Sequence, residues 1–498
     1  MRRGSVTVFL ALVLVLVLSF VCSLLEGARL LCIRAEAQMV TDICMQSMFG
    51  NYHAGIWEDY HLLFLDGSWQ TGDFSPEKFA GRAMDELEKN LSPRKDYTGT
   101  KFWDLTKFSA VDFDVTAYEL ATDNDGSVFE HQVSQQMKLE AASDALEKLS
   151  GLQEQKDAAE MEQKKKENKW DQACDAIEEA EEWKEEAELE GFEVSESVVA
   201  NGETELENPM EYVQEIKGFS VLSLVLEDPS GLSGKALEHP NFLVDRDRNQ
   251  GNWEENSDAN MTDRLWLQYY IQDYFSSYTG KSEKGPAETK LDYEIEYIIG
   301  GKESDGDNLE IVVNELLGIR EAMNLATIMQ DSTKTALALE IAMAAVGFTM
   351  MPLLVKAVQV GILLAWAYIE SILDVRSLLE GKKVPFLKRK DQWISDISGC
   401  RRCVESNAKT PEDEEGLNYG QYLQMLIMPL SQKILNYRCM DLIEQNEEVR
   451  MDFMLQSAEG VVQYQAEPLF WSLNMVSNQN FSAFSLVNSS TMTYGAFE

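Results

Sequence analysis

The chain has few histidines and lacks the short motifs that mark common enzyme families. It contains 4 histidines in 498 residues, and none lies at metal-ligand spacing from another: His53, His61, His131 and His239. The motifs G-x-S-x-G and H-E-x-x-H and the glycine-rich nucleotide fingerprint are absent. Gly280-Lys281-Ser282 matches the end of a phosphate-binding loop, but Phe275 stands where that loop needs its first glycine. These absences predict a protein that is not an enzyme and that holds no cofactor or metal.

Basic residues are also scarce, because 43 lysines and arginines face 85 acidic residues, giving a formal net charge of −42. Such a surface repels the phosphates of nucleic acids, so no nucleic acid is expected among the partners. The acidity does not indicate a disordered chain, since 45% of the residues are apolar or aromatic. The composition therefore predicts a packed, soluble body.

Cysteine is too rare for a disulfide framework, with 7 residues in a chain of this length. Cys400-x-x-Cys403, with Cys439 further along, forms the only cluster, and no second C-x-x-C or nearby histidine completes a zinc site. A structural disulfide or plain thiols are expected there, with a redox or metal role as the alternative. Asp123-Asn124-Asp125-Gly126 resembles part of a calcium loop, but its surroundings favour a simple turn.

What the chain does contain is a long apolar run at its N-terminus. Residues 4–25 carry no charge and include Val6, Phe9 and Leu25. At about 1.5 Å per residue the run is about 33 Å long, enough to cross a hydrocarbon core of roughly 30 Å. The run exceeds a typical signal-peptide core, so a retained anchor in membrane lipid is expected. Arg2 and Arg3 precede the run, which predicts a single-pass protein of the cell membrane with a cytoplasmic N-terminus and an extracellular bulk.

The helix is expected to continue beyond the membrane. Residues 26–49 contain no proline, apolar positions recur every three or four residues, and Gly50-Asn51 is a stop signal. One helix lying half in lipid and half outside has the shape of a pilin stalk. The alternative is an anchor followed by a separate amphipathic helix.

The rest of the chain predicts a mostly helical α+β protein in sequential parts. We expect the stalk over 1–50, an α+β segment over 51–129, a protruding charged helical arm over 130–192 and an acidic linker over 193–215. An α+β extracytoplasmic body over 216–390 and C-terminal helix and strands over 391–498 complete the division. Within the body, strands are predicted at Phe219–Leu226 and Tyr293–Ile299, the latter paired with Phe453–Tyr464. Asp307 or Asn308 is expected to cap the helix that runs through Arg320.

The apolar stretch over 336–369 allows two interpretations. Lys356 and Pro352 divide it into charge-free runs that are each shorter than the roughly 20 residues of a membrane span. A helical hairpin buried in the body is therefore favoured. The alternative is a second membrane element with a cytoplasmic flank at residues 382–390 that includes Lys388.

Two resemblances give these features a context. The segment RRGSVTVFLALVLVL resembles the N-terminus of the TadE/TadG-like pseudopilins of Tad (Flp-type) pilus systems. In those proteins the matching cut would follow Gly4 and leave Ser5 first, but Phe9 stands where cleaved members carry Glu, as in TadG-type members that keep their leader. Several phrases also resemble an uncharacterised family of Gram-positive membrane proteins: GIWEDYHLLFLD, TDNDGSVFEHQ, YEIEYIIGGKESDGDNL, LLAWAYIESILDVRSLLEGKKVPFLK, YGQYLQMLIMPL and YRCMDLIEQN.

The resemblance implies a non-catalytic, pseudopilin-like component of a Tad-type pilus or secretion apparatus, with other proteins of that apparatus as partners. A membrane-tethered surface module that binds a ligand or performs hydrolysis is the main alternative. It would require a concave site with convergent polar groups. A transport-associated protein that uses the 336–369 hairpin is a third, weaker possibility.

Overall fold

The chain folds into two compact units, each built from segments that are distant in sequence. The computed structural model describes residues 3–91, 106–140, 144–189, 209–237, 241–253, 261–469 and 483–495. Unit 1 comprises Met1–Gln136, Asp245–Asn260 and Glu447–Glu498, and unit 2 comprises Met137–Val244 and Met261–Asn446. The predicted division into sequential parts did not anticipate this interleaving.

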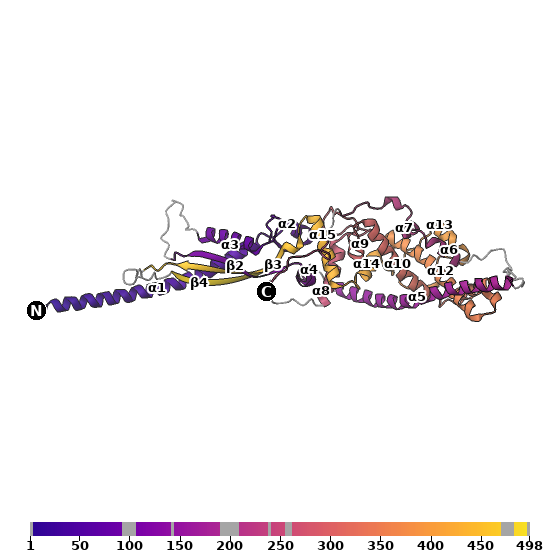
Figure 1. Ribbon diagram of the computed structural model, residues 1–498, viewed down its shortest axis with the longest axis horizontal. Helices are drawn as coiled ribbons and strands as arrows, with labels where there is room; N and C mark the ends of the chain where they lie inside the picture. The colour runs from indigo at the N-terminus through magenta and orange to yellow at the C-terminus, as the bar shows by residue number, and fades with distance from the viewer. Residues whose placement is uncertain are drawn as a thin grey trace. The chain divides into compact units, whose positions relative to one another are not determined.

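Unit 1 contains the long N-terminal helix and a small antiparallel sheet (Figure 1). Its elements are α1 (Arg3–Phe49), α2 (Ala54–Tyr60), β1 (Leu65–Asp66), α3 (Pro76–Leu91), β2 (Ser109–Leu120), the start of α4 (Asp123–Glu140), η5 (Met451–Phe453), β3 (Met454–Ala466) and β4 (Phe484–Thr493). The central strand is β3, which pairs with β2 along one edge and with β1 and β4 along the other. The predicted strand at Phe453–Tyr464 is therefore confirmed, although its partners differ from the predicted one.

In the part that the structure describes, the regular secondary structure of unit 2 is entirely helical, apart from isolated β-bridges. Its elements are α5 (Asp144–Leu189), α6 (Pro209–Ile216), α7 (Val221–Val225), η1 (Pro229–Gly231), α8 (Met261–Tyr274), α9 (Glu294–Gly300), α10 (Asp305–Ile328), α11 (Ser332–Val346), η2 (Gly347–Thr349), α12 (Pro352–Leu379), η3 (Lys390–Gln392), η4 (Ile397–Gly399), α13 (Cys400–Glu405), α14 (Tyr419–Ile427) and α15 (Gln432–Glu447). The chain as a whole is mostly helical with a small sheet, as the α+β prediction requires, but residues 216–390 do not form the expected mixed body.

Two predicted strands are helices in the structure. Phe219–Leu226 contains α7. The strand prediction was wrong because periodicity alone cannot distinguish a short buried strand from a short buried helix. Tyr293–Ile299 forms α9, in which the apolar residues and both glutamates from Glu294 to Ile298 are buried. A helix covered on all sides needs no polar face, so the alternating sequence did not determine its structure. The following helix, α10, is capped by Ser304, whose hydroxyl accepts a bond from the Asp307 amide at 3.2 Å, and not by Asp307 or Asn308.

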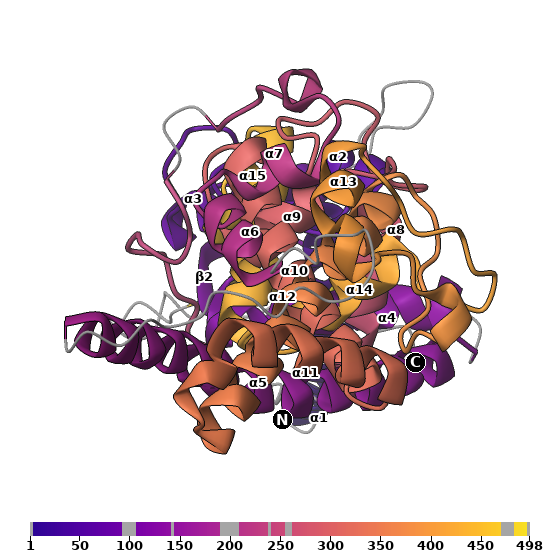
Figure 2. The same cartoon turned by 90° about the vertical axis from the view of Figure 1, so that its right-hand side faces the viewer.

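The described part of the predicted protruding arm over 130–192 comprises the end of α4 and the whole of α5, and α5 packs within unit 2. In α5 the buried positions are mostly alanines: Leu152, Ala159, Ala173, Ala176 and Ala180. They let α5 lie close to α10 and α12 (Figure 2). A stripe of alanines is a weak hydrophobic signal in a charged helix, which explains why the sequence indicated a solvated arm. Most of the predicted linker lies outside the described residues, and its last part forms α6.

The apolar stretch over 336–369 forms the hairpin of α11 and α12. From Val358 onward nearly every residue of α12 is buried within unit 2, which favours the core interpretation. Among the described residues, two helices are long and apolar enough to span a membrane, namely α1 from Val6 onward and α12. The apolar window of α1 is fully uncovered, whereas 67% of that of α12 is buried.

Candidate functional site

The strongest functional feature of unit 1 is that α1 is one continuous helix with two different surroundings. The membrane residues predicted from the sequence, Val6, Phe9 and Leu25, are each more than half exposed. From Ile33 to Phe49 the helix instead buries one face at three- and four-residue spacing. The structure thus confirms a single long helix, compatible with one membrane anchor, that extends into the folded body.

A buried ion pair marks the position where the exposed part of α1 ends. Arg29 Nη1 donates to Glu26 Oε1 at 2.7 Å, one helical turn away, and both side chains are buried. Arg29 Nη2 also donates to the Lys107 carbonyl at 3.2 Å, and the Leu469 amide donates to Glu26. The first two charges after the apolar run therefore neutralise each other and bind backbone groups of unit 1.

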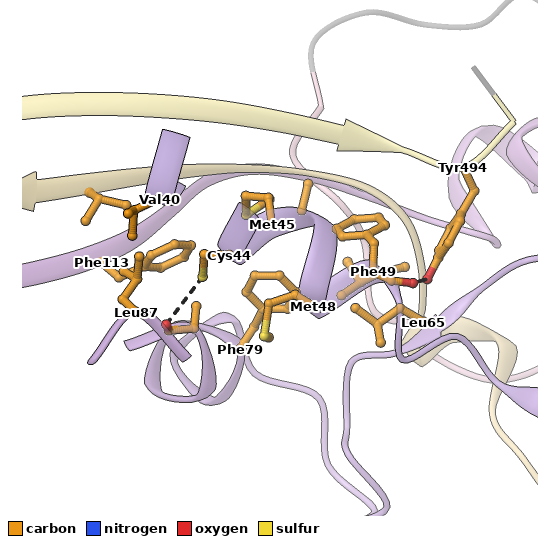
Figure 3. Packing of buried hydrophobic residues seen from close by; sticks show 14 of the residues in the cluster. Val40, Cys44, Met45, Met48, Phe49, Leu65, Phe79, Leu87, Phe113 and Tyr494 are labelled. Carbon is orange, nitrogen blue, oxygen red and sulfur yellow. Dashed lines mark hydrogen bonds between the residues drawn. The ribbon is translucent and has the colours of Figure 1, made fainter. Parts of the chain in front are cut away.

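The docked half of α1 packs into one hydrophobic cluster with the sheet and α3 (Figure 3). We call it the docking core, and its principal members are Val40, Cys44, Met45, Met48, Phe49, Leu65, Phe79, Leu87, Phe113, Val462, Tyr464 and Tyr494. These residues come from α1, from α3, from strands β1, β2 and β3, and from Tyr494 directly after β4. Helix α1 therefore covers one face of the sheet. If α1 were undocked, the apolar face of the sheet that it covers would be exposed to water.

Close backbone approach and hydrogen bonds fix α1 in the docking core. A Cβ on Gly460 would lie 2.5 Å from Phe113 Cζ and 2.9 Å from Met45 Sδ, so a larger residue at that point of β3 would displace these side chains. Thr41 Oγ1 and the Tyr464 hydroxyl share a hydrogen bond of 2.8 Å. The Tyr494 hydroxyl donates to the Phe49 carbonyl at the helix end. These contacts set the axial position of the helix as well as its burial.

None of the cysteines in the described residues takes part in a disulfide. Cys44 Sγ donates to the Ala83 carbonyl at 3.4 Å, and burial, with the nearby Glu86 charge, raises its pKa to about 12. Cys400, Cys403 and Cys439 form no disulfide in this structure.

Gly4 and Ser5, between which prepilin-type processing would cut, lie at the start of α1. The Asp123 carboxylate accepts hydrogen bonds from the amide of Leu120, at 2.7 Å, and from the amide of Gly251. Its carboxylate therefore closes a turn. Across the ranges that the structure describes, no three or more His, Cys, Asp or Glu side chains gather as a metal site would require.

A network of buried ions lies in unit 2, and it was not predicted from the sequence. Arg320 donates to Asp374 Oδ2 through Nε at 3.0 Å and Nη2 at 2.8 Å. Lys388 lies 2.6 Å from Asp374 Oδ1 and also pairs with Glu370, and all four side chains are fully buried. Two positive and two negative charges cancel, which is the condition for burying ions in a core. Lys388 is therefore unavailable as the cytoplasmic flank that a second membrane element would need.

Unit 2 also contains a cavity that was not predicted from the sequence, although Gly280 and Lys281 of the partial phosphate-loop match lie in its lining. It lies beside the loop between α8 and α9, and three buried carboxylates, those of Glu294, Glu296 and Asp305, bind the backbone of its walls. The acidic residues of YEIEYII were the available signal. The strand interpretation placed them on a solvent face, where glutamates need no explanation.

Comparisons with known proteins add a family and no activity. Searches of curated proteins and of solved structures return no match to the chain. A model described as a family of unknown function, DUF5702, matches residues 199–466, which include most of unit 2 and the central strand β3. The match covers more than half of the sequence, and the chain belongs to the DUF5702 family.

Proposed function

We propose that this protein is a non-catalytic, membrane-anchored extracytoplasmic component of a Tad-type pilus or secretion apparatus, acting like a pseudopilin. Its exposed helix half would lie in the membrane and pack against the apolar helices of other subunits. The folded units would lie outside the cell. The likeness of the first residues to TadE/TadG-type proteins supports this reading, and so does the two-part construction of α1.

The observation that carries the proposal is the rigid connection between an uncovered apolar segment and a sheet. Val6–Leu25 has the length of a bilayer crossing, and the same helix continues without a break into the docking core. A subunit held only by a flexible tether could not transmit the position of its membrane segment to its folded part. A helix held by packing at Gly460 and by the Tyr494 hydrogen bond can transmit that position.

The charge distribution supports the same arrangement. The apolar segment is preceded by Arg2 and Arg3, and the next charges are the paired Glu26 and Arg29. A neutralised pair at the outer end costs little to place at the membrane surface. The strongly acidic remainder suits an aqueous compartment and disfavours contact with anionic headgroups.

Site-specific photocrosslinking in the native host tests the proposal. A photoreactive residue at Leu16, which is 70% exposed, should crosslink to apolar helices of pilus or secretion proteins. Leu139, which is 82% exposed on α4, is the matched control and should give no such products. Crosslinks from Leu16 to lipid alone, in cells that assemble the apparatus, would refute the assignment to it.

Anchoring itself has a separate test. Val13→Asp places a charge near the middle of the apolar run, at a cost of about 2.5–3.5 kcal/mol for membrane insertion. The variant should be released from membranes by alkaline carbonate, while a Val111→Asp variant on the exposed side of β2 should stay bound. The intact mass of the purified chain shows whether residues 1–4 are retained. We expect retention, because Phe9 stands where cleaved pseudopilins carry Glu.

A further inference from the structure

The cavity in unit 2 has the size and position of a ligand site. Its volume is about 750 Å³, which lies within the usual range for small-molecule sites. The walls come from three parts of the chain that lie within the family match: Lys235, residues 276–281 and residues 287–293. No element of regular secondary structure forms these walls, so something else must hold them in place.

Two buried glutamates hold the first wall from behind. Glu294 Oε2 accepts the Ser276 amide at 2.9 Å, and Glu296 Oε1 accepts the Tyr278 amide at 2.9 Å. The glutamates are themselves fixed, since Asn446 donates to Glu294 at 2.8 Å and the Tyr419 hydroxyl donates to Glu296 at 2.7 Å. A further turn joins Ser277 to Gly280 through two backbone bonds. The loop is thus rigid before any ligand arrives.

A third buried carboxylate holds the opposite wall. Asp305 accepts the amides of Asp292 and Tyr293, each at 3.0 Å, and the Ser233 hydroxyl at 2.6 Å. Neither Glu294, Glu296 nor Asp305 is exposed to solvent. Burial raises the pKa of both glutamates to about 7, so their ionised forms weaken the fold. Costly buried acids that position a concave wall are a feature of functional sites.

The groups that line the cavity are hydroxyls, two tyrosines and a balanced set of charges. Lys235 and Lys281 are matched by Glu288 and Asp292, and Lys235 donates to Asp292 Oδ1 at 2.7 Å. The hydroxyl side chains are Ser276, Ser277, Thr279 and Thr289. Tyr278 and Tyr293 meet edge to face with ring centroids 5.3 Å apart. The cavity therefore offers many short donors and acceptors beside aromatic rings, with no net charge of either sign.

We infer that this cavity binds a neutral, hydroxyl-rich ligand, namely a short saccharide, between the Tyr278 ring and the Lys235–Asp292 pair. An anion would meet Glu288 and Asp292, and a cation would meet the two lysines. A ring of alternating hydroxyl and C–H groups satisfies both the paired charges and the tyrosine face. The inference does not depend on the pilus proposal, and either can fail alone.

Calorimetric titration of the full-length chain tests the inference. The protein should be held in a detergent without a sugar headgroup, and titrated with chitotriose and with cellotriose. We expect saturable binding of at least one of them with a dissociation constant in the millimolar range or tighter. The tripeptide Gly-Gly-Gly and inorganic phosphate should give no heat of binding.

Three variants locate the site. Tyr278→Ala should weaken binding about tenfold, whereas Tyr269→Ala, a half-buried tyrosine of α8 outside the cavity, should leave it unchanged. Glu296→Ala releases the Tyr278 amide without touching the ligand, and should weaken binding, while Glu296→Gln keeps the acceptor and should restore it. Failure of both saccharides to bind at 20 mM would overturn the inference. Binding that survives Tyr278→Ala, or binding of the peptide or phosphate instead, would also overturn it.

Discussion

Truncation of Phe49 is the most direct test of whether α1 belongs to the folded core. The side chain is 2% exposed, and its ring lies 4.9 Å, centroid to centroid, from that of Tyr494. Phe49→Ala removes this ring but keeps the carbonyl that accepts the Tyr494 hydroxyl. Lost burial together with the remaining cavity should cost about 3–5 kcal/mol.

That cost is large relative to the whole stability of a domain, which is typically about 5–15 kcal/mol. For a unit of this size, each kcal/mol lowers the melting temperature by about 2–4 °C, so a decrease of about 6–20 °C is expected. Scanning calorimetry of the full chain in detergent should show the decrease in one transition. The transition of unit 2 should keep its temperature, because Phe49 belongs to unit 1.

Phe219→Ala provides the matched control. Phe219 is 56% exposed in unit 2, and its truncation should change stability by no more than about 0.5 kcal/mol. Equal small effects of both substitutions would mean that the second half of α1 is not docked. The two-part description of the helix, and the proposed function built on it, would then be wrong.

Three further outcomes are expected for unit 2. The folded-state pKa of Glu294 and Glu296 is about 7, above the ordinary glutamate value of 4.5, so the folded chain holds extra protons between those values. Its stability therefore falls as the pH rises through this window. Each group contributes on the order of 3 kcal/mol, so melting temperatures should fall from pH 5 to pH 8, and less steeply in Glu296→Gln. Lys388→Met leaves buried carboxylates without their partner and should cost about 3–5 kcal/mol in urea unfolding, whereas Lys382→Met at an exposed pair should cost under about 1 kcal/mol. Gly361→Ala would bring a Cβ to 2.6 Å from Ala173 Cβ, and the overpacking should cost about 1–3 kcal/mol in the same assay.

The sequence predicted the features that depend on a single long periodic segment. The extent of α1 followed from its apolar run, the absence of proline and the stop at Gly50, and all of these are local signals. The strand at Phe453–Tyr464 was also correct, because alternation there reflects a sheet with one face covered by α1. The buried hairpin of α11 and α12 followed from runs that are too short to span a bilayer.

The features that depend on contacts between distant segments were not predictable. The carboxylates of Glu294 and Glu296 are buried and accept hydrogen bonds from the amides of a distant loop. The segment YEIEYII contains no information about that loop. Lys388 looked like a surface lysine, since its partners Glu370 and Asp374 lie in a different helix. The interleaving of the units is likewise a property of the whole chain. Hydrophobic periodicity describes one element at a time and carries no information on these partners.

The position of β3 in the chain has a consequence for biosynthesis. Strand β3 begins at Met454, long after α1 and β2 have left the ribosome, yet it is the centre of the sheet that α1 closes. The part of α1 that packs against β3 and β4 must therefore stay uncovered until those strands are made, while α3, which is synthesised early, covers another part of the same face. A nascent or truncated chain would present that face to chaperones and proteases as a sign of incompleteness. Only a chain that includes β3 and β4 can cover this face completely, so closure of the sheet requires that synthesis has passed both strands.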